Sequence, residues 1–159
     1  MIMDKSLVIN YQEYSDVAAL PSADKELMEL AERAAAGAYA LYSHFHVGAA
    51  VRLADGTVVC GNNQENAAYP SGLCAERTAI FAASAQHPEL RDYEAIAIMG
   101  VNENGEKCEA SPCGSCRQVL SEYEQRQKHP LRVVCYVDKN CVRVFRSVAD
   151  LLPFAFNLE

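Results

Sequence analysis

The chain has 159 residues, of which 50% are apolar and 22% charged, and its formal net charge is −7. This composition is typical of one globular domain, and it excludes both a disordered chain and a pair of full-sized domains. The acidic balance argues against a surface that follows nucleic-acid phosphates, because such a surface needs clustered Lys and Arg.

The sequence contains no run of 18 apolar residues, so no membrane-spanning helix is expected. Residues 1–5 lack the charged and then apolar pattern of a signal peptide, and the seven cysteines are odd in number. A cytoplasmic protein without a disulfide framework is therefore expected. In such a chain, closely spaced cysteines indicate metal or redox chemistry.

Residues 1–21 are interpreted as an N-terminal extension. Leu7, Ile9 and Tyr11 alternate as in a short edge strand, but Val8 interrupts the alternation. A helix is expected next, with Ser22 as its N-cap and one apolar face that continues to about residue 38.

The rest of the chain alternates between strands and helices. Asp55-Gly56 is a strong hairpin signal between two strands, and the polar loop that follows the second strand is a candidate binding loop. This order predicts an α/β sandwich with a mixed sheet of about five strands, formed by residues 22–159. The expected elements are strands at 46–54, 57–60, 93–99, 131–137 and 142–145, helices at 74–85 and 113–125, a polar connection at 102–110 and a helical turn at 148–152.

Three cysteines sit where two of these helices begin. Positions 74–76 read Cys-x-Glu and positions 112–116 read Pro-Cys-x-x-Cys, the pattern of zinc nucleoside and nucleobase deaminases in its three-cysteine form. Catalytic zinc takes three protein ligands and leaves a fourth position for water. Cys113 and Cys116 would share one helix face, and a helix N-terminus favours thiolate. Cys74, Cys113 and Cys116 are therefore predicted to hold one zinc ion per chain.

Two neighbours of Cys74 fit supporting roles. Glu76 is close to the metal without having to bind it, so it suits a general acid and base. Three thiolates and Zn²⁺ sum to −1, and Arg77 is placed to donate hydrogen bonds to the sulfurs and to offset that charge. Without the cysteines, Glu76 and Arg77 would be interpreted only as a helix-start carboxylate and a surface cation.

A structural zinc site is the alternative for the cysteines. It needs a fourth ligand, and the remaining cysteines and the four histidines show no paired metal spacing apart from that of Cys135 and Cys141. Cys60, Cys108, Cys135 and Cys141 are therefore predicted to be packing or surface thiols.

With these motifs the chain resembles the small, homotetrameric cytidine deaminases of the three-cysteine kind. The likeness runs from about residue 22 to residue 156. Leu41 departs from the proline that the family usually has, and Phe154 replaces a small residue. The motifs that carry the likeness lie at 42–50, 63–69, 74–77, 112–118 and 151–153.

The resemblance implies a three-layer α/β/α sandwich, a homotetramer and a role in pyrimidine salvage. The implied reaction is zinc-dependent hydrolytic deamination of cytidine and deoxycytidine with release of ammonia, in which Glu76 carries protons to N3 and to the departing amino group. The Ala75 backbone N–H would bind the base carbonyl, and Asn63 and Glu65 the ribose 3′-hydroxyl. Phe45 would flank the pyrimidine; considered alone, it is a core aromatic at a strand entrance.

The C-terminus carries one further implied role. Phe156 matches the aromatic residue that, in the family, reaches the site of a neighbouring subunit.

Recognition of the ribose 3′-hydroxyl would make both cytidine and deoxycytidine acceptable substrates. It would disfavour a nucleotide within a polymer, whose 3′-oxygen is esterified.

Three other functions compete with this hypothesis. A deaminase of aminonucleoside antibiotics, such as blasticidin S, shares the zinc chemistry but lacks the complete loop motif at 63–66 and the Phe at position 45. A polynucleotide deaminase needs a basic or aromatic path for single strands, against which the net charge of −7 argues. A zinc-stabilised binding module without catalysis would have no use for Glu76.

Overall fold

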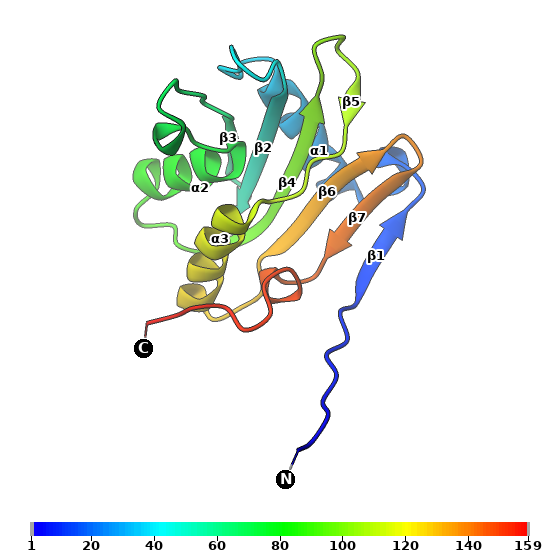
Figure 1. Ribbon diagram of the computed structural model, residues 1–159, viewed down its shortest axis with the longest axis vertical. Helices are drawn as coiled ribbons and strands as arrows, with labels where there is room; N and C mark the ends of the chain where they lie inside the picture. Colours follow the sequence, from blue (N-terminus) through cyan, green and yellow to red (C-terminus); the bar gives the residue numbers. More distant parts are fainter. Residues whose placement is uncertain (1, 159) are drawn as a thin grey trace.

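A mixed sheet of seven strands forms the centre of the protein in the computed structural model, which describes residues 2–158 (Figure 1). The predicted segments 1–21 and 22–159 thus each have one terminal residue outside the described range. The strands are β1 (Tyr11–Tyr14), β2 (His46–Leu53), β3 (Val58–Asn62), β4 (Tyr93–Val101), β5 (Lys107–Cys108), β6 (Arg132–Asp138) and β7 (Cys141–Phe145).

The strand order is β1-β7-β6-β4-β2-β3, and β5 pairs with the end of β4. Only β4 and β6 run parallel, with Ala95 opposite Arg132, and the other pairs are antiparallel. Parallel neighbours need a crossover connection, which usually contains a helix, and here α3 (Gly114–Gln127) lies between them in sequence.

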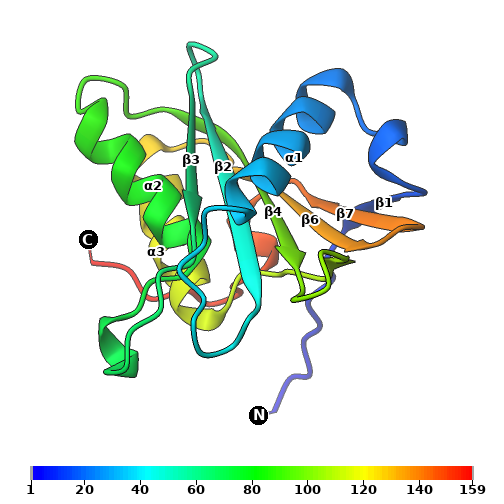
Figure 2. The same ribbon diagram turned by 90° about the horizontal axis from the view of Figure 1, so that it is seen from above.

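Helices cover both faces of the sheet, as Figure 2 shows. The helix α1 (Ser22–Ala35) lies on one face, and α2 (Ala75–Gln86) and α3 lie on the other. Two apolar clusters fill the spaces between these layers, one with α1 and one with α2 and α3. The predicted three-layer α/β/α class is therefore confirmed. No helix among residues 2–158 has the length and apolar character needed to cross a membrane.

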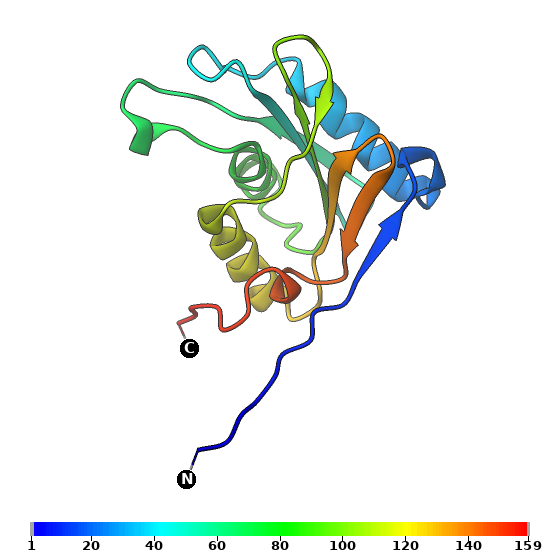
Figure 3. The same ribbon diagram turned by 45° about the vertical axis from the view of Figure 1, so that its right-hand side comes forward.

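The prediction of about five strands is wrong by two. The strand β5 falls in the predicted polar connection at 102–110, because a strand of two residues is too short to show a period. The strand β1 falls in the predicted N-terminal extension, where Val8 interrupts the alternation. The strand β1 pairs with the edge strand β7, and Tyr11 lies opposite Phe145 with the two rings 5.5 Å apart. The chain before β1 runs away from the sheet (Figure 3).

The start of α1 also differs from the prediction. Pro21 occupies the cap position, no side chain caps the helix, and Ser22 is its first residue. The first-turn Asp24 is buried and pairs with two arginines, Arg52 at 3.4 Å and Arg132. Two cations thus balance the buried carboxylate and tie α1 to the sheet.

Two glycines allow helices to approach the sheet closely. A Cβ added at Gly61 on β3 would lie 2.3 Å from the Ala79 nitrogen of α2, and one at Gly48 on β2 would lie 1.8 Å from the Ala31 oxygen of α1. In both cases the obstacle is helix backbone, which cannot turn aside as a side chain can. The position of α2 therefore depends on the missing side chain at Gly61.

We expect Gly61→Ala to lower the free energy of unfolding by about 1–3 kcal/mol, because the added methyl group pushes α2 off the sheet. Denaturant unfolding measures this change. Gly105→Asn is the control, since Gly105 faces open space and its positive φ is one that Asn tolerates. Equal stability of Gly61→Ala and the unaltered protein would contradict the close-packing argument.

Candidate active site

Two helices begin beside each other at one edge of the sheet. The strand register explains why the two helix starts lie together. The strand β2 starts at this edge, and β3 and β4 end there, since Gly48 lies opposite Asn62 and His46 lies opposite Val101. Cys74 follows β3 through a loop and is the N-cap residue of α2. Cys113 follows β5 and is the N-cap residue of α3, with Cys116 in the first turn.

The three predicted metal ligands come together at these helix starts. The Sγ atoms of Cys74, Cys113 and Cys116 all lie within 4.8 Å of one another, and the Cys74–Cys113 distance is 3.7 Å. Cys116 is buried and Cys113 is exposed, so the group has a protein side and an open side. Three soft sulfur donors with one open side fit zinc in a catalytic site, where the fourth position belongs to water.

Arg77 lies beside the sulfurs, as predicted. Its guanidinium donates a hydrogen bond to Cys74 Sγ at 3.6 Å, and its Nε is buried without a partner among residues 2–158. Hydrogen bonds from the Cys116 thiol, Arg77 and Cys113 lower the pKa of Cys74 to about 5. The pKa of Cys116 is raised, because its thiol donates to the Cys74 thiolate and because it is buried. Cys74 is therefore readily ionised, whereas a bound metal would have to displace the proton of Cys116.

Glu76 lies in the first turn of α2, two residues beyond Cys74. Its side chain is almost fully enclosed, with the residue 4% exposed, and burial raises its pKa to about 7. A carboxyl group with this pKa accepts and releases a proton readily near neutral pH, as a general acid and base must. A buried carboxylate that served only to begin a helix would have no need to leave water.

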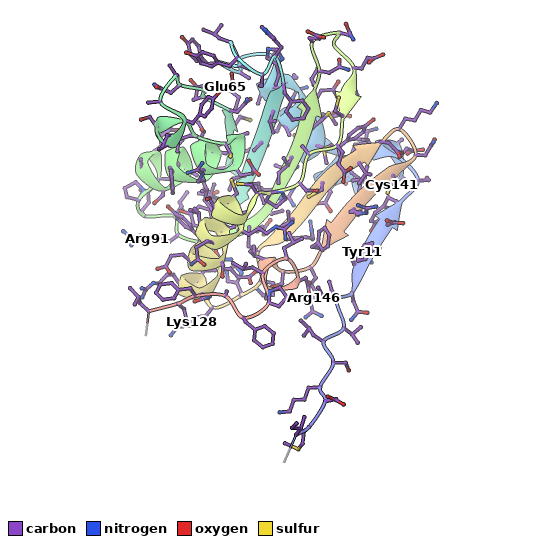
Figure 4. All side chains as sticks on the ribbon, viewed as in Figure 1. Tyr11, Glu65, Arg91, Lys128, Cys141 and Arg146 are labelled. Carbon is purple, nitrogen blue, oxygen red and sulfur yellow. The ribbon has the colours of Figure 1, made fainter. Side chains whose placement is uncertain are left out.

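A cavity of about 320 Å³ opens beside Glu76. A neighbouring cavity of about 450 Å³ shares Ser43, Asn63, Glu65 and Cys74 with it and reaches Arg77. Figure 4 shows Glu65 at the edge of the sheet where β2 begins, far from Lys128 at the end of α3. The predicted site residues that line the smaller cavity are Phe45, Asn63, Glu65, Cys74, Ala75, Glu76 and Cys113.

Asn63 holds the start of β2 against the end of β3. Its Oδ1 accepts a hydrogen bond from the Val47 N–H at 2.7 Å, and its Nδ2 donates to the Phe45 oxygen at 2.9 Å. The Phe45 ring lies over Gly100 on β4, where an added Cβ would come within 2.6 Å of the ring. Gly100 is not among the predicted site residues, and its only signal in the sequence is a glycine directly after the apolar segment 93–99.

Phe156 does not join the cavity within one chain. Its side chain is exposed, and its backbone oxygen accepts a hydrogen bond from Gln118 Nε2 at 3.0 Å. Phe154 is 97% exposed and has a positive φ of 56°. Arg117 steadies this tail, because its guanidinium donates both to the Pro112 oxygen at 2.8 Å and to the Leu151 oxygen at 3.0 Å.

Comparison with known proteins agrees with this geometry. Residues 21–130 match the model of the cytidine and deoxycytidylate deaminase zinc-binding region. The chain belongs to this family. The matched range contains all three cysteines and Glu76, whereas β1 lies outside it.

Curated and solved relatives cover most of the chain. It is 46% identical over 134 residues to a cytidine deaminase of Halalkalibacterium halodurans, covering 84% of this chain and 93% of the relative. It is 39% identical over 132 residues to one of Mycobacterium tuberculosis, covering 81% and 86%. The crystal structure of cytidine deaminase from Burkholderia pseudomallei is 44% identical with a TM-score of 0.71, covering 82% of this chain and 97% of that one.

In zinc-free protein we expect iodoacetamide to label Cys74 at pH 6–7 much faster than Cys60. The Cys74 thiolate persists above pH 5 and is lost as the pH falls through that value, whereas burial raises the pKa of Cys60. Peptide mass spectrometry at several pH values measures both rates.

The variant Arg77→Gln should slow the labelling of Cys74 at pH 6, because it removes a cation and a donor from the sulfur. Bound zinc should protect Cys74 and leave the rate at Cys60 unchanged. Equal rates at the two cysteines of zinc-free protein would show that Cys74 has an ordinary thiol pKa.

Proposed function

We propose that the chain catalyses the zinc-dependent hydrolytic deamination of cytidine and deoxycytidine to uridine and deoxyuridine, with release of ammonia. The observation that carries this proposal is one cavity lined by the buried carboxyl group of Glu76, whose pKa is about 7, and by Cys74 and Cys113, two members of the cluster of three cysteines. Membership in the deaminase family supplies the reaction class.

Cys74, Cys113 and Cys116 are the proposed zinc ligands. Zinc bound there would supply a Lewis acid that lowers the pKa of a water molecule. Arg77 offsets the negative charge of the sulfurs through its hydrogen bond to Cys74.

Glu76 is the proposed proton carrier. Its carboxylate takes a proton from the attacking water and gives it to N3 of the pyrimidine. A second proton, from the hydroxyl group now on C4, then passes through Glu76 to the amino nitrogen, so that the C4–N bond breaks, ammonia leaves and the C4 carbonyl of uridine forms. The sum is one cytidine and one water converted to one uridine and one ammonia. Burial of Glu76 supports this role, because it brings the two protonation states close in free energy.

The remaining cavity residues are proposed to bind the nucleoside. The Ala75 N–H, at the first position of α2 where the helix itself supplies no acceptor, donates to the base carbonyl, and Phe45 flanks the ring. Asn63 and Glu65 bind the 3′-hydroxyl. Each polar atom of the Asn63 amide makes one hydrogen bond, to Val47 on β2 or to Phe45 just before it, and keeps capacity for another. Both nucleosides fit because neither contact involves the 2′ position.

The proposal also covers the oligomeric state, the cellular location and the metabolic role. We assign a homotetramer in which Phe156 reaches a neighbouring site, a cytoplasmic location and a role in pyrimidine salvage. The exposed aromatic rings of Phe154, Phe156 and Tyr69 support subunit contacts. Free thiols at all seven cysteines support a reducing compartment.

Glu76→Gln should lower kcat for cytidine about a thousandfold, because the amide cannot carry protons. Bound zinc should stay at about one per chain, and stability should not fall, because a buried amide costs less than a buried carboxylate. Ammonia release, metal analysis and thermal unfolding on the same sample measure the three quantities. The control is Glu122→Gln, an exposed carboxylate on α3 paired with Arg126. Retained turnover in Glu76→Gln would refute the proposed mechanism.

A substrate panel tests the specificity. We expect loss of both cytidine and deoxycytidine, followed by base absorbance and ammonia, and no loss of CMP. Turnover of blasticidin S alone would move the function to antibiotic deamination and leave the metal site unchanged. Bound zinc without turnover of any panel member would favour the non-catalytic binding module.

A further inference from the structure

Among residues 2–158, the Glu65 carboxylate accepts hydrogen bonds from two adjacent residues only. The backbone N–H groups of Tyr42 and Ser43 donate to its Oε2 at 2.8 and 3.3 Å, and the Ser43 hydroxyl donates to its Oε1. These bonds lower the pKa of Glu65, with the Ser43 hydroxyl as the largest cause. Glu65 is therefore an ionised acceptor with both oxygens engaged.

The Ser43 hydroxyl also makes a second contact. Its oxygen accepts a hydrogen bond from the Phe45 N–H at 3.1 Å, across a turn in which His44 has a positive φ of 53°. Ser43 Oγ is thus a donor to Glu65 and an acceptor from Phe45 at once. It links the residue proposed for the ribose to the residue proposed for the base.

The Ser43 hydroxyl restricts a rotation of the Glu65 carboxylate that the two backbone donors alone would permit. Both backbone N–H groups bind Oε2, so alone they would let the carboxylate plane turn about that oxygen. The bond to Oε1 removes this rotation, in the way that two-point contacts generally fix a carboxylate. The direction of the free lone pairs of Glu65 then depends on Ser43.

We propose that Ser43 is a positioning residue for nucleoside recognition, whose hydroxyl sets the Glu65 carboxylate in the orientation that accepts the ribose 3′-hydroxyl. This inference rests on the proposed function. Ser43 itself needs no contact with the reacting atoms. The hydroxyl therefore affects substrates that have a 3′-hydroxyl more strongly than substrates without one.

Two isomeric substrates separate this role from general damage to the loop. 2′-Deoxycytidine keeps the 3′-hydroxyl, and 3′-deoxycytidine lacks it. In Ser43→Ala we expect kcat/KM for 2′-deoxycytidine to fall about tenfold, mainly through KM, because one hydrogen bond to a charged group is lost while two remain. The value for 3′-deoxycytidine should change less than about twofold, because that substrate makes no use of Glu65 and is affected only by the lost bond to the Phe45 N–H.

Two further variants complete the test. Ser43→Thr keeps a hydroxyl and should restore most of the KM. Thr57→Val removes a similar bond, since the Thr57 hydroxyl donates to Asp55 at 3.0 Å at the other end of the β2–β3 hairpin, and it should leave both substrates unchanged.

Equal losses for both isomers in Ser43→Ala would overturn the inference and indicate a structural role in the loop. An unchanged KM for 2′-deoxycytidine would overturn it as well. Absence of cytidine turnover by the unaltered protein would instead remove the proposed function on which the inference rests.

Discussion

The contact between α2 and β3 at Gly61 determines where the candidate site forms. Helix backbone lies against strand backbone there, so α2 has one position along the sheet and its first turn projects at the edge where β3 ends. The helix α3 begins at the same edge, because it forms part of the crossover between the parallel strands β4 and β6. Two helix N-termini thus face one point, and the metal ligands and Glu76 follow from that arrangement.

The site concentrates negative groups in a protein that is already acidic. Three thiols and three carboxyl groups, those of Glu65, Glu76 and Glu109, line or adjoin one cavity, and Arg77 is the one cation among the residues that line either cavity in the described structure. Oriented hydrogen-bond donors, rather than further cations, stabilise the negative charges of the site. The starts of α2 and α3 favour thiolate, and backbone N–H groups of the 42–43 segment favour the Glu65 carboxylate. A divalent cation suits such a site, because it supplies the missing charge directly.

The cysteines, Glu76 and Arg77 were predictable because their spacing and their place at helix starts are local features of the sequence. Phe45, Asn63 and Glu65 came from the family resemblance, and the structure places them on the same cavity. Ser43 and Gly100 escaped prediction, because their importance lies in contacts with residues far along the chain. The strands β1 and β5 escaped for a related reason: each depends on pairing with a neighbour, and neither shows a clean period of its own.

The site is divided between a rigid part and an exposed part. Glu76 and Cys116 sit on helices that are packed into the core, so their geometry has the stability of the whole fold. Ser43 and Glu65 lie on loops held by a few hydrogen bonds, and Ser43 is exposed to solvent. Groups of the first kind cannot shift without disturbing the core, whereas groups of the second kind can. Because the proposed proton carrier belongs to the first part and the proposed ribose contacts to the second, the proposed function implies that sugar preference can change through loop residues while the deamination chemistry stays intact.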